Sequence, residues 1–135
     1  MKAFLFLVIF SSIMLSGCVP NIGGGGGAVS SDEFAKGKVV KGFPNLPAYP
    51  KAQVLESYGK EGSYGANFMT GDDLAKVIKF YNGSLPGLGW ETQAKKQSET
   101  NYVFDIKNAQ DAGSVIVNVA ADGKNTAITI FVSPR

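Results

Sequence analysis

Few side chains in this sequence are of a type that does chemistry. The 135 residues include no histidine, and Cys18 is the single cysteine. Histidine is the usual general base and the commonest zinc ligand, so its absence weakens most catalytic and metal-site hypotheses. A lone cysteine excludes both an internal disulfide and a cysteine metal cluster. We therefore predict no catalytic residue, no cofactor and no metal site, which leaves the thiol of Cys18 as the reactive group to explain.

Carboxylates are the remaining candidates for catalysis. Asp72 and Asp73 are adjacent, but neighbouring positions on a helix point about 100° apart, and charges favourable to a helix start explain both. The other acidic residues that could form a glycosidase pair are scattered along the chain: Glu91, Glu99, Asp105, Asp111 and Asp122. Nothing in the sequence brings two of them to the separation of about 5–10 Å that glycosidases need. A carboxylate-dependent cell-wall hydrolase is therefore the weakest functional hypothesis.

The surroundings of Cys18 indicate a role for its thiol. Lys2 is followed by an apolar run at residues 3–14, whereas a membrane-spanning helix needs roughly 20 residues. The run ends in Leu15-Ser16-Gly17-Cys18, which resembles the lipobox of bacterial lipoproteins. The resemblance implies that residues 1–17 are a signal peptide cleaved before Cys18. It also implies that the sulfur of Cys18 carries a diacylglycerol, so that the chain is anchored to a membrane.

The residues after the cysteine indicate a compartment and a spacer. Val19 resembles the outer-membrane sorting pattern of enteric-type bacteria, so we expect the cell envelope, at the outer membrane facing the periplasm if the cell is Gram-negative. Five glycines at residues 23–27 lose much backbone entropy on ordering and behave as coil. Residues 18–41 are therefore predicted to be a lipidated N-terminus and a flexible tether.

Residues 42–135 are predicted to form a single α+β domain. Alternating apolar residues predict strands at 52–58, 63–69, 90–97, 102–107, 115–119 and 126–132. One apolar stripe at helical spacing separates the second strand from the third, and consists of Leu74, Val77, Ile78, Tyr81 and Leu85. The predicted order is β-β-α-β-β-β-β, an antiparallel sheet of about five to six strands with one amphipathic helix on one face.

Local signals predict where the helix begins and ends. Thr70 can cap its start, and Asp73 three residues later completes a pair that resembles a capping box. Pro86 cannot continue a helix, so we expect the helix to end near Leu85.

The last hairpin has the clearest predicted register. Asp122-Gly123 is a favoured two-residue turn between two alternating runs. Centring the turn on these residues pairs Val117 with Ile128 on the buried face.

A second resemblance covers residues 43–135. Tyr49-Pro50-Lys51-Ala52, Phe80-Tyr81, Leu85 and Gly89-Trp90 resemble a pattern in small exported prokaryotic domains, in which "YP-x-A" opens the first strand. The domain is also loosely similar to the helix-grip modules of outer-membrane assembly lipoproteins. The resemblance implies a fold and a compartment, but no substrate.

Three aromatic residues of this pattern have different expected roles. Tyr81 and Trp90 have the spacing of core residues. Phe80 lies at the edge of the apolar stripe, so we expect it to be partly exposed and to contact a partner.

Three functions remain after these exclusions. A net charge of +2, with Arg135 as the one arginine, does not provide the basic surface that nucleic acids need. The first hypothesis is a non-catalytic binding or assembly module of the cell envelope, with an envelope protein or peptidoglycan as partner. The alternative is a small-molecule or lipid carrier, because a helix across a sheet can enclose a pocket. The hydrolase remains the least favoured.

Overall fold

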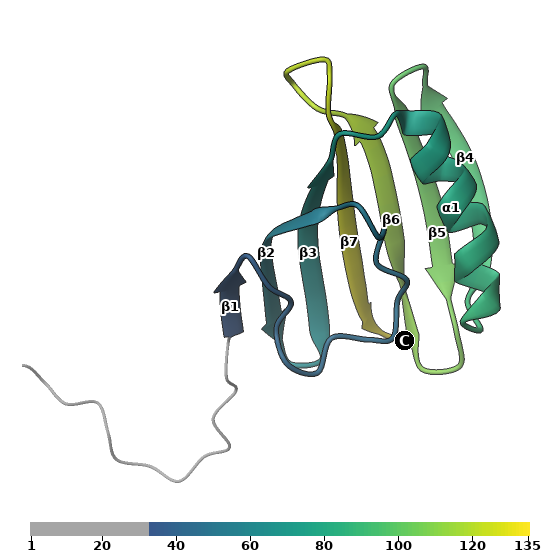
Figure 1. Cartoon of the computed structure of the whole chain (residues 1–135). Helices are drawn as coiled ribbons and strands as arrows, with labels where there is room; N and C mark the ends of the chain where they lie inside the picture. Colours follow the sequence, from purple (N-terminus) through teal and green to yellow (C-terminus); the bar gives the residue numbers. More distant parts are fainter. Residues whose placement is uncertain (1–32) are drawn as a thin grey trace, which may run out of the picture.

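The computed structural model describes residues 33–135 (Figure 1). Cys18, the predicted signal peptide and the predicted tether up to residue 32 lie outside the described residues, so what was expected of them remains a prediction. The described part contains seven strands and one helix: β1 (Glu33–Lys36), β2 (Gln53–Lys60), β3 (Ser63–Thr70), α1 (Leu74–Gly87), β4 (Glu91–Ser98), β5 (Asn101–Lys107), β6 (Asp111–Val119) and β7 (Thr126–Pro134). The α+β class, the antiparallel sheet and the helix between the second and third predicted strands are confirmed, but the predicted strand count was too low.

All seven strands form one sheet in the order β1-β2-β3-β7-β6-β5-β4, and every neighbouring pair is antiparallel. The C-terminal strand β7 therefore lies at the centre, between β3 and β6. Helix α1 connects β3 to β4, which forms the far edge of the sheet (Figure 1).

The additional strand, β1, corrects the predicted tether. Phe34 pairs with Tyr58 of β2, and the buried hydroxyl of Ser57 joins the following segment to the sheet. This hydroxyl accepts a hydrogen bond from Val40 N at 2.8 Å and donates one to Lys38 O at 2.8 Å. Residues 33–41 thus belong to the folded domain. A strand of four residues is too short to show a period, so only its pairing with β2 reveals it.

One face of the sheet is covered and contains the core. Val77, Tyr81 and Leu85 of α1 are fully buried, and each such side chain contributes about 1.5–3 kcal/mol by leaving water. The sheet residues that complete the core come from four strands: Ala66, Phe68, Phe104, Ile106, Val115, Val117, Ile128, Ile130 and Val132. The predicted apolar stripe of the helix is therefore the face that packs on the sheet.

The connection between β1 and β2 covers the rest of this face, beside α1 (Figure 1). Phe43, Leu46 and Tyr49 pack against the core, and the indole Nε1 of Trp90 donates a hydrogen bond to Asn45 O at 3.0 Å. Trp90 is 3% exposed, as predicted for a core residue. No element between residues 33 and 135 covers the opposite face of the sheet.

The predicted register of the last hairpin is confirmed, because Val117 pairs with Ile128. Its turn is longer than predicted, since residues 120–125 connect the strands and Asp122 Oδ1 accepts hydrogen bonds from the backbone N–H groups of Lys124 and Asn125. The register survives because the longer loop has the same centre.

Both predicted helix ends need correction. The N-cap is Asp73, whose Oδ1 accepts a hydrogen bond from Lys76 N at 2.9 Å. Thr70 instead ends β3, where its Oγ1 accepts a hydrogen bond from Asp72 N. Pro86 lies inside the last turn and the helix ends at Gly87, because the fixed φ of proline is compatible with helical geometry.

Candidate functional site

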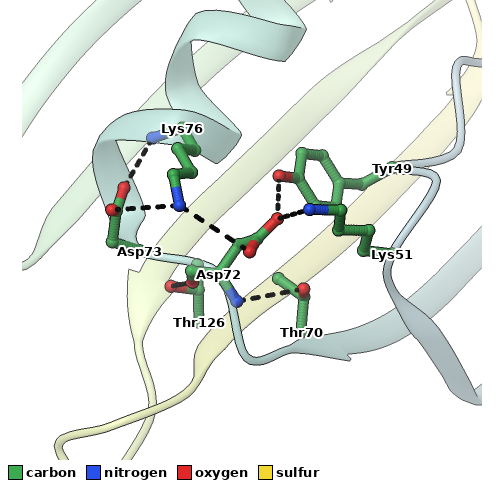
Figure 2. A network of polar contacts seen from close by, with 7 residues as sticks. All are labelled: Tyr49, Lys51, Thr70, Asp72, Asp73, Lys76 and Thr126. Atoms are coloured by element: carbon green, nitrogen blue, oxygen red, sulfur yellow. Dashed lines mark hydrogen bonds and ion pairs between the residues drawn. The ribbon is translucent and has the colours of Figure 1, made fainter.

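A carboxylate joins three segments at the start of α1 (Figure 2). Asp72 Oδ2 accepts a hydrogen bond of 2.5 Å from the hydroxyl of Tyr49. The Nζ atom of Lys51 lies 3.6 Å from the same oxygen, and Nζ of Lys76 lies 4.0 Å from Oδ1. Asp72 therefore joins the segment before β2 to the first turn of the helix.

Two threonines fix the backbone that carries this carboxylate. The hydroxyl of Thr126, at the start of β7, donates a hydrogen bond to Asp72 O at 2.7 Å. The hydroxyl oxygen of Thr70, at the end of β3, lies 3.2 Å from Asp72 N. Both threonines are buried, so the position of Asp72 is set by the ends of two neighbouring strands.

The electrostatics of the hydrogen-bonded pair Tyr49 and Asp72 suit binding and positioning rather than proton transfer. The hydrogen bond from Tyr49 and the charges of Lys51 and Lys76 hold the pKa of Asp72 below its usual range. The same hydrogen bond raises the pKa of Tyr49 to about 12. At neutral pH the carboxylate is therefore ionised and the phenol protonated.

A pocket of about 580 Å³ lies between the start of α1 and the tips of the β4–β5 and β6–β7 hairpins. We call it the helix–hairpin pocket. Its apolar wall consists of Leu74, Ala75, Ile78, Tyr102 and Val119, and its polar rim includes Lys96, Glu99, Lys124 and Asn125.

The core closes the inner end of this pocket. The ring of Tyr102 lies 5.2 Å from that of Phe104, which is fully buried, and Phe104 in turn packs on Tyr81 at 6.1 Å. Side chains thus fill the deeper space between helix and sheet. The pocket can hold one end of a molecule beside α1, but not a large molecule across the whole sheet.

A second hollow, of about 460 Å³, lies on the other side of the helix start. We call it the Phe80 pocket. The ring of Phe80 packs edge-on against Tyr49 at 5.2 Å and against Tyr81 at 5.1 Å, and three lysines surround it: Lys51, Lys76 and Lys79. Phe80 is half-buried and lines a hollow, and the partner contact expected of it remains a prediction.

A third hollow, of about 540 Å³, brings together two of the carboxylates considered above. Glu91 lies 3.1 Å from the Nζ of Lys107, and Asp105 lies 2.6 Å from that of Lys95. Their side chains are 74% and 45% exposed, and each carboxylate is paired with a lysine. Residues 33–135 also contain no group of three or more potential metal ligands.

Sequence reasoning missed both pockets beside the helix start. Leu74 and Ile78 were recognised as apolar stripe residues, but the hairpin tips that complete their pocket are distant in the sequence. Tyr49 and Asp72 are 23 residues apart, and only the "YP" motif marked that stretch at all.

In this architecture one amphipathic helix lies across an antiparallel sheet, with a hollow beside the helix start. Residues 52–132 match the family described as START domain-like. Since this match spans more than half of the chain, the protein belongs to the START domain-like family. Searches among curated proteins and among solved structures found no significant match. Between residues 33 and 135, no helix has the length and hydropathy of a membrane span.

Proposed function

We propose that this protein is a non-catalytic binding module, anchored in the cell envelope, that holds a small amphipathic ligand in the helix–hairpin pocket. The observation that carries the proposal is the position of that pocket, between the helix start and the hairpin tips of a START domain-like fold. Its volume of about 580 Å³ lies within the range of roughly 300–1,000 Å³ typical of ligand sites. The carrier hypothesis thus gains more support than the assembly hypothesis.

The lining indicates the chemistry of the ligand. Leu74, Ile78 and Tyr102 offer an apolar surface for a hydrocarbon chain. Lys96 at the rim is paired with Glu99 at 2.6 Å, whereas Lys124 has no ion-pair partner among the described residues. An anionic head group at the rim would pair with Lys124, so a fatty acid or a related lipid fits the pocket.

The anchor is the second part of the proposal. It is supported by the lipobox resemblance at residues 15–18. Mass spectrometry of the N-terminal peptide should show diacylglyceryl-modified Cys18 with residues 1–17 removed. An unmodified thiol on an uncleaved chain would contradict this part alone.

The pocket is tested with a fatty acid that carries a photoactivatable diazirine. The probe is added to the lipidated protein in nanodiscs, and its adducts are mapped by mass spectrometry. We expect adducts on residues of the pocket wall. Ala75→Trp should fill the pocket and reduce these adducts at least tenfold, because Ala75 lines it and is exposed.

Asn82→Trp is the matched control, since Asn82 is exposed two turns further along α1 and does not line the pocket. Its adducts should equal those of the wild type. Pocket labelling that is unchanged by Ala75→Trp would contradict the proposed site.

A second candidate function has one specific observation in its favour. The Phe80 pocket combines a half-buried aromatic ring with Lys79, and with Lys51 and Lys76, which pair with Asp72. This lining suits a partner with carboxylates, such as a peptidoglycan peptide or an envelope protein. A photo-reactive residue at position 80 should then capture one defined partner in intact cells. The same residue at position 82 should capture nothing, and equal capture at both positions would argue against the contact.

A further inference from the structure

Large apolar side chains are exposed in one region of the domain. Among the described residues, five of them lie on β1, β2, β7 or the segment after β1: Phe34, Val39, Leu55, Tyr58 and Phe131. A sixth, Leu88, lies apart at the end of α1. Phe34 is the most exposed, at 60%.

Strand register places the three aromatic residues of this set in one row on the uncovered face of the sheet. Phe34 pairs with Tyr58, Tyr58 with Gly65, and Gly65 with Phe131. A Cβ atom at Gly65 would overlap the ring of Tyr58, so that ring extends over β3 toward Phe131. We call Phe34, Tyr58 and Phe131 the aromatic row.

The aromatic row is an unusual surface for an isolated soluble domain. Contiguous exposed apolar patches commonly mark interaction sites. Beyond Phe131, the row continues with Ser114 and Asp105 on β6 and β5, so its apolar part is confined to the β1 side of the sheet. That side is also where the chain before residue 33 joins the domain (Figure 1).

The charged residues beside the row are of both signs. On the same face, Lys36 lies two residues after Phe34 on β1 and Lys60 lies two residues after Tyr58 on β2, while Glu56 pairs with Lys36. Lys38 and Lys41 belong to the segment that Ser57 bonds on the covered face. The row therefore combines aromatic rings with lysines at its edge, as in protein surfaces that bind the interface of a bilayer.

Chain length brings this surface near a membrane. With the proposed anchor at Cys18, residues 19–32 allow Glu33 to lie at most about 50 Å from the bilayer. The β1 edge is then the part of the described domain nearest the anchor along the chain, and the high local concentration of membrane favours even weak binding.

The proposed anchor favours a bilayer over a second copy of the chain. The anchor would keep the row within reach of a membrane, whereas pairing of two rows depends on protein concentration.

We propose that the aromatic row docks on the surface of a phospholipid bilayer, with the uncovered face of the sheet turned toward the membrane. This inference rests on the proposed anchor at Cys18, but not on the proposed ligand of the helix–hairpin pocket. It predicts a fixed orientation for a domain that the tether alone would leave free to rotate.

The test measures the depth of a spin label in the lipidated protein. Acylation consumes the thiol of Cys18, so one introduced cysteine can be labelled. Ser114→Cys places the label beside Phe131 without removing a ring, and Asn82→Cys places one on the exposed side of α1. The protein is reconstituted in vesicles of phosphatidylcholine with phosphatidylglycerol, and collisions with a water-soluble nickel chelate are measured by electron paramagnetic resonance.

Relative to detergent solution, vesicles should reduce nickel accessibility at least threefold at position 114 and leave position 82 unchanged. Phe34→Ser combined with Phe131→Ser should restore accessibility at position 114. Leu88→Ser removes an exposed apolar side chain elsewhere and should not.

Three results would overturn the docking. Equal accessibility at positions 114 and 82 in acylated protein would overturn it and leave the anchor intact. Spin–spin broadening that grows with protein density at position 114 would assign the face to a second copy. An unmodified Cys18 in the same preparation would overturn the anchor and the docking together, while the fatty-acid labelling experiment would still decide the pocket.

Discussion

The hydroxyl of Tyr49 donates a hydrogen bond of 2.5 Å to Oδ2 of Asp72, and so connects the segment before β2 to the turn before α1. The ring of Tyr49 packs on Phe80, while Asp72 is held by the ends of β3 and β7. One contact thus fixes the start of the helix, and with it the two pockets on either side. The contribution of this hydrogen bond to the stability of the protein can be measured directly.

The Tyr49–Asp72 contact predicts a dependence of stability on alkaline pH. The pKa of Tyr49 is about 12 in the folded protein and about 10 in the unfolded chain. A raised folded-state pKa gives stability that is fully present below pH 10 and is lost as the pH rises from 10 to 12. Tyr49→Phe should lower the melting temperature by several degrees at pH 8, and should flatten the decline of the unfolding free energy above pH 10. An unchanged alkaline slope in Tyr49→Phe would contradict this assignment.

At a second tyrosine, Tyr81, we expect replacement by phenylalanine to raise stability rather than lower it. Tyr81 is 1% exposed, and its hydroxyl has no hydrogen-bond partner among residues 33–135. A backbone group of Tyr49 lies near it, but without the geometry of a hydrogen bond, and burial raises the pKa of Tyr81. Removing a buried, unpaired hydroxyl relieves a desolvation penalty, so Tyr81→Phe should stabilise the protein by about 1 kcal/mol. Urea unfolding measures this change, and a clear loss of stability would show that the hydroxyl has a partner.

Asp73 is the N-cap of α1, and the contribution of its capping hydrogen bond to stability can be separated from that of its charge. Asp73 Oδ1 accepts a hydrogen bond from Lys76 N, whereas its ion pair with Lys76 Nζ, at 3.8 Å, is exposed and contributes little. Asp73→Ala should lower the unfolding free energy by about 1 kcal/mol, while Asp73→Asn keeps a capping oxygen and should cost only a few tenths. Equal losses in both variants, measured by urea unfolding, would indicate that charge rather than capping matters.

Gly65 and Gly113 both pair with β7, but they should respond differently to substitution by alanine. At Gly65 the new Cβ would meet the outer end of the exposed Tyr58 side chain, which can move aside. At Gly113 it would overlap the backbone oxygen of Phe131 and lie 2.8 Å from Cα of Val132, where the backbone of β7 cannot move without breaking pairing. Gly65→Ala should therefore change stability by less than about 0.5 kcal/mol, and Gly113→Ala should cost about 1–3 kcal/mol.

Parallel urea unfolding of the two variants checks this contrast. Gly65→Ala also tests the aromatic row, since it retains every ring but displaces that of Tyr58. Equal losses of stability would show that the ring of Tyr58 cannot move.

Much of the fold could be predicted because its signals are local. The register of Val117 with Ile128 follows from alternation about one turn, and the stripe that includes Val77 and Tyr81 follows from helical spacing. The errors arose where local signals compete. Thr70 and Asp73 are both good caps, and only the buried position of Thr70 at the end of β3 decides between them.

The candidate site could be predicted only in part. Phe80 was selected from its place at the edge of the stripe, and it does line a pocket. The wall that includes Tyr102 and Val119 was not foreseen, because nothing in the sequence states which hairpin tips meet the helix start.

The sequence by itself determined the helix and every described strand except β1, because a period of two or of 3.6 residues reports which side chains leave water. The tertiary structure decided the strand order, which places β7 at the centre and β1 at an edge. Only this order brings Tyr49 to Asp72 and aligns Phe34 with Phe131 on one face. Contacts between distant segments depend on which strands become neighbours, and that choice is made by the packing of the whole core, not by any single stretch of chain.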